Sequence, residues 1–257
     1  MVTEPRYLTV PAYVCAVDLG PVTVIVNYRN GRVETLIGPA ARWWHLATAS
    51  GDADVPTVLD EVSTQTLRRQ LEAAGLIAPM PTPRPGRPTV AGASWVPSWG
   101  TQEMTAGRAE PVRVPLGATI RAGLALAVVL GVLAAGRPHR RMARLVGLLK
   151  RTSTLATIPA AAEQAARAAH AVRLAGLIVP GRVACLEESA AVAVLLAVSR
   201  RRVTWCHGAA ADPVRLHAWV ETDDGDRVGE PPSTGRFTVL RTIPERDPGT
   251  EQRRRKR

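Results

Sequence analysis

Hydrophobic positions near the start of the chain follow the alternation that is typical of β-strands. Residues 13–19 and 22–28 are rich in β-branched and aromatic side chains and are separated by Gly20-Pro21, so we expect two strands there. Asn30-Gly31 is the strongest hairpin signal in the sequence and turns the second strand back into a third over 32–37. The sequence therefore predicts a small three-stranded sheet.

A helical period replaces this alternation after the sheet. Apolar residues at spacings of three and four predict three helices, at 40–48, 55–62 and 64–74. Ser63 or Thr64 is expected to cap the third helix, and Gly75 to end it. A small sheet with three helices resembles the winged helix-turn-helix fold, which by itself says little about function.

Prolines then interrupt the pattern and divide the chain. Eight prolines lie between positions 79 and 115, together with Gly, Ser and Thr, and this composition is typical of a linker. We therefore expect an α+β protein of two domains, with a first domain at 1–79, a linker at 80–115, a second domain at 116–244 and a basic disordered tail at 245–257.

The second domain is predicted to be helical first and extended afterwards. Periodicity predicts helices at 118–136, 139–150, 158–175 and 185–198, followed by strands at 202–207, 216–221 and 237–243. The fourth helix begins at Cys185. The unpaired N–H groups and the positive end of the macrodipole at such a position favour the thiolate, which is the nucleophilic form of cysteine.

The strand at 216–221 carries a histidine, His217, on one of its two faces. The Asp224-Gly225 pair predicts a hairpin whose second strand returns to Glu230. With these two residues at the centre of the turn, Glu230 is a diagonal neighbour of His217 and lies within side-chain reach. Glu230 is therefore our first choice for a carboxylate that orients His217, and Asp224 and Asp226 stay open as alternatives. A one-residue change in loop length would reverse the faces and rule out this choice.

A cysteine, a histidine and an acid on successive elements are the parts of a thiol nucleophile with an oriented base. Such a set supports hydrolysis and acyl transfer alike. A cysteine on an apolar helix is, however, most often a small buried hydrophobe. A non-catalytic peptide-binding adaptor therefore remains an alternative.

The charge balance bears on the partners of the protein. A net charge of +11 favours acidic partners, but the excess is dispersed apart from runs at 137–151 and 253–257, and such runs are usually solvated. Arg68-Arg69 stand on a predicted helix that also carries Glu72, which makes a poor phosphate-binding surface. We expect no nucleic-acid partner and keep a DNA-binding regulator as an alternative.

Cysteine usage and hydropathy bear on the compartment. The three cysteines, at 15, 185 and 206, form neither a disulfide framework nor a C-x-x-C zinc pattern, so no metal is expected. This usage and the absence of a signal-peptide pattern indicate the cytoplasm. Residues 122–136 are uncharged, but they are shorter than the roughly 20 residues of a membrane span. We expect a buried helix there, with peripheral membrane contact as the minor alternative.

One segment of the second domain closely resembles a known family. It reads ACLEESAAVAVLLAVSRRRVTWCHGAAADPVRLHAWVE, and it is similar to the core of the leader peptidase of lasso-peptide biosynthesis, a transglutaminase-like cysteine protease. The resemblance implies a papain-like or transglutaminase-like fold, with Cys185 as the nucleophile and His217 as the base. The third member of that family's triad follows a short hairpin and is often Asp; Glu230 matches it by position.

The same resemblance implies partners. The freed core peptide would pass to a separate ATP-dependent cyclase, with which this family works. The chain has no G-x-x-x-x-G-K-[ST] loop of its own. We therefore expect no cofactor on this chain and ATP only on the partner cyclase.

The first domain resembles a precursor-recognition element of ribosomal-peptide biosynthesis, similar to the pyrroloquinoline-quinone chaperone. In that family the leader peptide adds to the third strand and packs against the third helix, a form of β-strand addition. The resemblance implies contacts with a leader peptide from six residues, namely Val33, Thr35, Leu36, Leu67, Arg68 and Leu71. The alternative is that the apolar members of this set only close a small core.

Overall fold

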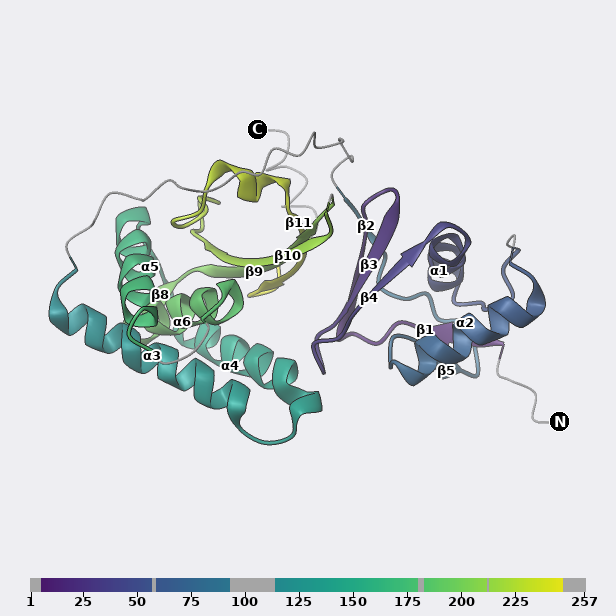
Figure 1. Ribbon diagram of the computed structural model, residues 1–257, viewed down its shortest axis with the longest axis horizontal. Helices are drawn as coiled ribbons and strands as arrows, with labels where there is room; N and C mark the ends of the chain where they lie inside the picture. Colours follow the sequence, from purple (N-terminus) through teal and green to yellow (C-terminus); the bar gives the residue numbers. More distant parts are fainter. Residues whose placement is uncertain (1–5, 57–58, 93–113, 180–182, 212, 247–257) are drawn as a thin grey trace. The chain divides into compact units, whose positions relative to one another are not determined.

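The structure is a computed structural model that describes residues 6–56, 59–92, 114–179, 183–211 and 213–246. The chain forms two compact units, residues 1–96 and residues 97–257, apart from 210–213 at a hairpin tip. Each unit combines helices with β-sheet (Figure 1). The expected α+β class is therefore confirmed.

A four-stranded sheet with the order β4-β3-β2-β6 is the centre of the first unit. β2 (Val14–Asp18), β3 (Val22–Asn27) and β4 (Val33–Ile37) pair antiparallel, and β6 (Val90–Ala91) joins β2 in parallel. The turn predicted at Asn30-Gly31 is confirmed, because Val26 faces Val33 across it and Gly31 has φ of +80°. As expected, β4 lies at an edge of this sheet.

Two helices follow the sheet within the described residues, α1 (Gly38–Ser50) and α2 (Glu61–Ala73). The helix expected at 55–62 is wrong, because residues 51–56 and 59–60 are not helical. Pro56 disfavours helix formation, and the Asp60 carboxylate accepts a hydrogen bond from the N–H of Ser63 (2.8 Å). Asp60 therefore caps α2, in place of Ser63 or Thr64. With two helices, the winged helix-turn-helix arrangement is not confirmed.

Residues 78–92 pack onto the first unit, beyond the boundary expected at 79. β5 (Ala78–Met80) pairs with β1 (Tyr7–Thr9), and β6 pairs with β2. Between these strands the Gly86 N–H donates to the Thr48 carbonyl (2.9 Å), and the Trp44 indole N–H donates to Thr89 (3.2 Å). The prolines keep this segment extended, and its extended backbone lies against the unit. The rest of the expected linker, 93–113, lies outside the described residues.

We predict that Gly51→Ala destabilises the first unit more than Gly20→Ala does. Both glycines have positive φ, but a Cβ on Gly51 would come 2.6 Å from the Arg84 backbone N, whereas one on Gly20 meets nothing within 4 Å. The backbone conformation alone costs about 1–2 kcal/mol, and overpacking adds about 1–3 kcal/mol at Gly51. Urea unfolding followed by hydrogen exchange in peptides from residues 6–92 measures both losses. Equal losses would contradict the packing of Arg84 against α1.

In the described part of the second unit, four helices come first. They are α3 (Leu116–Ala134), α4 (Arg141–Leu155), α5 (Ala162–Gly176) and α6 (Cys185–Val198), with a 3-10 turn at Pro138–Arg140 before α4. The bounds predicted for α6 are confirmed. α5 begins later than the predicted residue 158, because β7 (Ile158–Pro159) pairs in parallel with β8 (Arg201–Arg202). α6 packs against the other three helices.

α3 differs from the buried helix expected at 122–136. It is the one helix in the described part of the chain that is long and apolar enough to cross a membrane, with a mean hydropathy of 2.0, yet only 28% of its apolar stretch is buried. The side chain of Arg144 on α4 donates hydrogen bonds to the Val132 and Leu133 carbonyls at the end of α3 and to the Arg137 carbonyl that follows it. These bonds hold α3 against α4.

A three-stranded sheet completes the second unit, with β9 (Thr204–Ala210) between β10 (Arg215–Glu221) and β11 (Thr238–Ile243). The four helices lie on one side of it (Figure 1). Glu245 and Arg246, the first residues of the expected tail, contact Lys150 and Glu221 of the second unit. Residues 247–257 lie outside the described part of the chain.

Candidate functional site

Cys185 is the first residue of α6 and is half-buried, whereas Cys15 and Cys206 are buried. The preceding residue, Ala184, is extended (φ −107°, ψ 177°), so the helix begins abruptly at the thiol. The Glu187 carboxylate folds back and accepts the Ala184 N–H (3.1 Å). The first N–H groups of α6 have no acceptor within the helix, so they can interact with a group bound beside the thiol.

His217 on β10 contacts both other members of the predicted set. Its Nε2 lies 2.7 Å from Glu230 Oε2, and its ring interacts with the Cys185 thiol. Because Nε2 is engaged by Glu230, we assign the interaction with the thiol to Nδ1. The structure thus brings Cys185, His217 and Glu230 together around one cavity.

Glu230 reaches His217 by a different route from the one the sequence predicted. The Thr222 N–H donates to Asp226 O and the Val228 N–H to Val220 O (both 3.0 Å), so the turn is one residue longer and the predicted register is wrong. Continued pairing would have turned Glu230 away from His217. Pairing ends at Val228 instead, and Gly229, at φ +65°, redirects the chain. That bend brings the Glu230 carboxylate back to the imidazole.

Arg173 on α5 holds the segment that carries Glu230. Its Nε donates to Glu188 Oε1 (2.6 Å), and its Nη2 donates to the Gly229 carbonyl (3.0 Å) and lies 3.9 Å from Glu230 Oε1. The Thr234 hydroxyl donates to Glu230 Oε2 (3.0 Å). Arg173 and Thr234 were not predicted from the sequence, and no spacing signal marks them because they lie on separate elements.

Aromatic rings surround the imidazole of His217. Trp219 stacks on it with centroids 5.8 Å apart and an interplanar angle of 14°, and Phe237 lies 5.2 Å away at 46°. The Trp219 indole N–H is held by the buried Glu221 carboxylate (2.8 Å). The ring of His217 is therefore fixed by packing on its faces and by hydrogen bonds at its edge.

The charges of the three residues depend on one another. Burial raises the pKa of the Cys185 thiol, but its hydrogen bonds with His217 and Ala218 and the charge of His217 outweigh burial, so this pKa lies below its ordinary value. Burial lowers the pKa of His217, but the hydrogen bonds and charges of Cys185 and Glu230 raise it to about 9. Burial likewise raises the pKa of Glu230, and its partners lower it below the usual value. The pairing with His217 therefore shifts the Cys185 thiol towards the thiolate and His217 towards the imidazolium.

A cavity of about 140 Å³ adjoins the three side chains and is lined also by Arg173 and Glu188. Binding pockets for whole small molecules usually have about 300–1,000 Å³. This cavity therefore accommodates only part of a substrate, such as one side chain of a peptide. A larger groove in the same unit lies elsewhere along α6.

Three other residues considered from the sequence lie outside the group formed by Cys185, His217 and Glu230. Asp224 and Asp226 are exposed at the hairpin turn. His207 is buried on β9 and stacks on Trp205; burial, and then the charge of His217, lower its pKa to about 4. No group of three or more metal-ligating side chains is found among the described residues.

The six residues expected to bind a leader peptide divide into two groups in the first unit. Val33 and Thr35 are exposed on β4. Leu36 and Leu71 are buried in one hydrophobic core against which Leu67 packs, and Arg68 is buried with its Nε 3.0 Å from Glu72 Oε1. The accessible part of the expected surface is therefore the β4 edge.

Residues 127–242 match the family model described as the transglutaminase-like superfamily. The match contains Cys185, His217 and Glu230. The C-terminal half of the chain carries a transglutaminase-like domain. Members of this superfamily are typically cysteine-type enzymes. No curated protein and no solved structure matches the chain.

We predict that Cys185 in the transglutaminase-like domain stays reactive at pH values where an ordinary cysteine is protonated. The thiolate is the reactive form, so alkylation should decline only as the pH falls through the lowered thiol pKa. His217→Asn should raise that pKa, and wherever the pKa lies above the working pH each unit of increase lowers the thiolate fraction by about tenfold. The measurement is mass spectrometry of the Cys185 peptide after timed exposure to iodoacetamide, with buried Cys15 and Cys206 as internal references. Identical pH profiles for the wild type and His217→Asn would contradict the pairing.

We predict that Glu230→Gln lowers the pKa of His217 from about 9 towards its ordinary value of 6.5, by about 1–3 pH units, because the carboxylate charge is lost. NMR titration of isotope-labelled histidine measures this change. Glu163→Gln is the matched control, since Glu163 is exposed on α5 and pairs with Arg167. An unchanged titration of His217 in Glu230→Gln would argue against the role assigned to Glu230.

Proposed function

We propose that this protein is a cysteine peptidase that binds the leader of a ribosomally synthesised precursor peptide and cleaves it during lasso-peptide maturation. The observation that carries the peptidase part is the placement of Cys185, His217 and Glu230 around one cavity, with His217 hydrogen-bonded to Glu230. The match of this region to the transglutaminase-like superfamily supports it. The choice of a lasso precursor rests on the resemblance of the segment from Cys185 to Glu221 to leader peptidases.

In the proposed mechanism the Cys185 thiolate attacks the scissile carbonyl and forms a tetrahedral intermediate. His217, as the imidazolium, protonates the leaving amine, and the neutral imidazole then removes a proton from the water that hydrolyses the thioester. Glu230 orients the ring and stabilises its charge. The N–H of Cys185, in the first turn of α6, is the proposed oxyanion donor.

Leader recognition is assigned to the first unit. The open edge of β4 offers unpaired backbone groups to an extended peptide, and Val33 and Thr35 are the exposed side chains beside that edge. Leu36, Arg68 and Leu71 are buried, so they support β4 more than they contact a ligand. A leader held on the first unit raises the effective concentration of its cleavage site near Cys185.

The proposed partners are the precursor leader and a separate ATP-dependent cyclase that receives the freed core peptide. ATP would act on the cyclase, and this chain would work in the cytoplasm without a cofactor or a nucleic-acid partner. A reducing compartment is compatible with the free thiols of Cys15, Cys185 and Cys206.

We predict that the wild-type protein cleaves a precursor peptide encoded by a neighbouring gene at its leader boundary and that Cys185→Ala does not. The thiol supplies the nucleophile, so its removal should lower the cleavage rate by at least about a thousandfold. Mass spectrometry of the peptide, with and without the cyclase, measures this. Equal cleavage by both proteins would remove Cys185 from the mechanism. Leader binding without cleavage, together with an unreactive Cys185, would favour the non-catalytic adaptor.

Acyl transfer is the second candidate function, and the superfamily match favours keeping it. The thioester formed on Cys185 can be attacked by an amine in place of water, and the same three residues serve both reactions. Product analysis with and without an added primary amine separates the two. Amide products in the presence of the amine would replace the peptidase proposal with a transferase.

A further inference from the structure

The outward side of α3 is apolar where a helix on the surface of a soluble protein is normally polar. Four large aliphatic side chains follow one another at intervals of four residues and stay largely exposed, namely Leu116 (76%), Ile120 (56%), Leu124 (63%) and Val128 (48%). Single exposed aliphatic residues need no explanation, but a continuous apolar stripe marks an interaction site.

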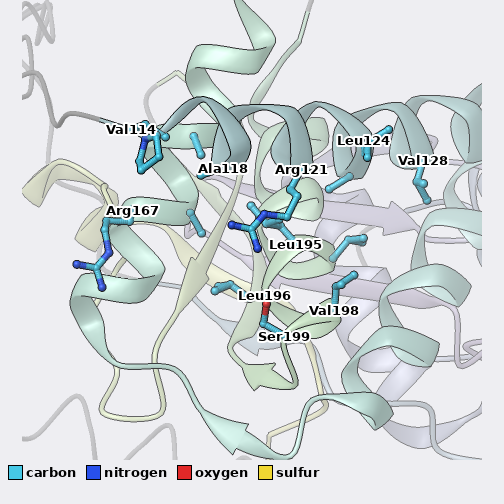
Figure 2. A pocket seen from close by; sticks show the side chains of 15 residues that line it. Val114, Ala118, Arg121, Leu124, Val128, Arg167, Leu195, Leu196, Val198 and Ser199 are labelled. Carbon is cyan, nitrogen blue, oxygen red and sulfur yellow. The ribbon is translucent and has the colours of Figure 1, made fainter.

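A groove beside this stripe extends the apolar surface. It has a volume of about 500 Å³ and lies between α3, α5 and the C-terminal half of α6. Figure 2 shows Leu124 and Val128 on the α3 side of the groove and Leu195, Leu196 and Val198 facing them. Val194, the first α6 residue in its lining, is nine residues from Cys185, or about 14 Å along the helix. The groove is therefore separate from the thiol site.

Two arginines supply the charge of this surface. Arg121 projects from α3 into the groove and Arg167 lies near its Val114 end (Figure 2). Arg121 Nε is hydrogen-bonded to the Gly117 carbonyl (3.2 Å), and Arg167 lies 3.7 Å from an exposed carboxylate, that of Glu163. No acidic residue lines the groove in the described part of the chain. The surface is thus complementary to a ligand that is apolar in its body and negative at its head.

We propose that α3 and this groove bind the surface of a membrane that contains anionic phospholipid. The exposed aliphatic stripe would lie among the acyl chains at the membrane boundary, and Arg121 and Arg167 would lie at the level of the phosphates. The groove would take up part of an acyl chain. This proposal is independent of the peptidase proposal, because it uses none of the residues around Cys185.

The packing of α3 argues for a peripheral position and against a membrane span. The other side of α3 is buried in the domain through Ala122, Ala125, Leu126, Val129 and Leu133. These side chains would have to leave the contacts with α4, α5 and α6 before α3 could cross a bilayer. A helix that has one side in the domain core and an apolar side outside can contact a membrane only at the interface between lipid and water.

The composition of the groove argues for lipid and against a protein partner. Its lining is aliphatic apart from Arg121, Arg167 and Ser199, and none of the lining residues is aromatic. Protein interfaces are enriched in Trp, Tyr and Phe, which supply most of their hot spots. Aliphatic side chains beside arginines match the chemistry of acyl chains beside phosphates.

The test is co-sedimentation of the full-length protein with vesicles of phosphatidylglycerol mixed with phosphatidylcholine, compared with vesicles of phosphatidylcholine alone. We expect binding to the anionic vesicles that weakens as salt is added, because exposed charges are screened. Leu124→Asp should weaken binding by about tenfold or more, since it removes an aliphatic side chain that would be buried among the acyl chains. Arg121→Gln should weaken binding to the anionic vesicles by about fivefold.

Val62→Asp is the matched control, because Val62 is a 73% exposed aliphatic on α2 in the first unit and the substitution changes the net charge equally. Alkylation of Cys185 at the wild-type rate verifies that each variant keeps its fold. Should Leu124→Asp fail to fold, the Arg121→Gln and Arg167→Gln double variant carries the test. Absent binding to the anionic vesicles, or equal binding by Leu124→Asp and the wild type, would overturn the proposal. So would a dimer that Leu124→Asp dissociates while vesicles stay unbound, since that result assigns the surface to a second copy of the chain.

Discussion

The burial of α6 is the constraint on which the second unit depends. Three helices and β10 pack around it, and its small side chains, Ala190, Ala191 and Ala197, allow their close approach. Because α6 cannot shift without disturbing all of these contacts, its first residue is fixed in position. Cys185 is thus held at the edge of a rigid core, where its thiol is half-buried and still faces His217.

Electrostatic balance around the thiol is maintained by residues from three elements. Glu188 stands three residues after Cys185 and lines the same cavity. Arg173 from α5 pairs with it and at the same time holds the Gly229 carbonyl. One guanidinium therefore screens the carboxylate beside the nucleophile and fixes the bend that presents Glu230. Loss of Arg173 would therefore disturb both Glu188 beside Cys185 and the bend that presents Glu230.

The sequence predicted those parts of the site that local periodicity determines. The bounds of α6 and the strand that carries His217 follow from the spacing of apolar residues. Glu230 was chosen by a hairpin register that the structure contradicts, and it contacts His217 because Gly229 turns the chain after pairing has ended. The backbone conformation of Gly229 and the contact of Arg173 with residues distant in the sequence produce no periodic pattern. The spacing of residues therefore could not predict them. The prediction of a helix at 55–62 was wrong for a local reason. Asp60 caps α2 there, and this capping outweighed the apolar pattern.

The short strand β6 has a consequence for how the first sheet meets other chains. By pairing with β2 at Val17 and Asp18, it occupies part of one border of the sheet and leaves β4 at the other. An unpaired border is a template for any extended polypeptide, including a second copy of the same sheet. Val90 and Ala91 thus close part of the β2 border to an added strand. Trimming the chain at 79 would uncover this border, and the sheet would then offer two templates for self-association.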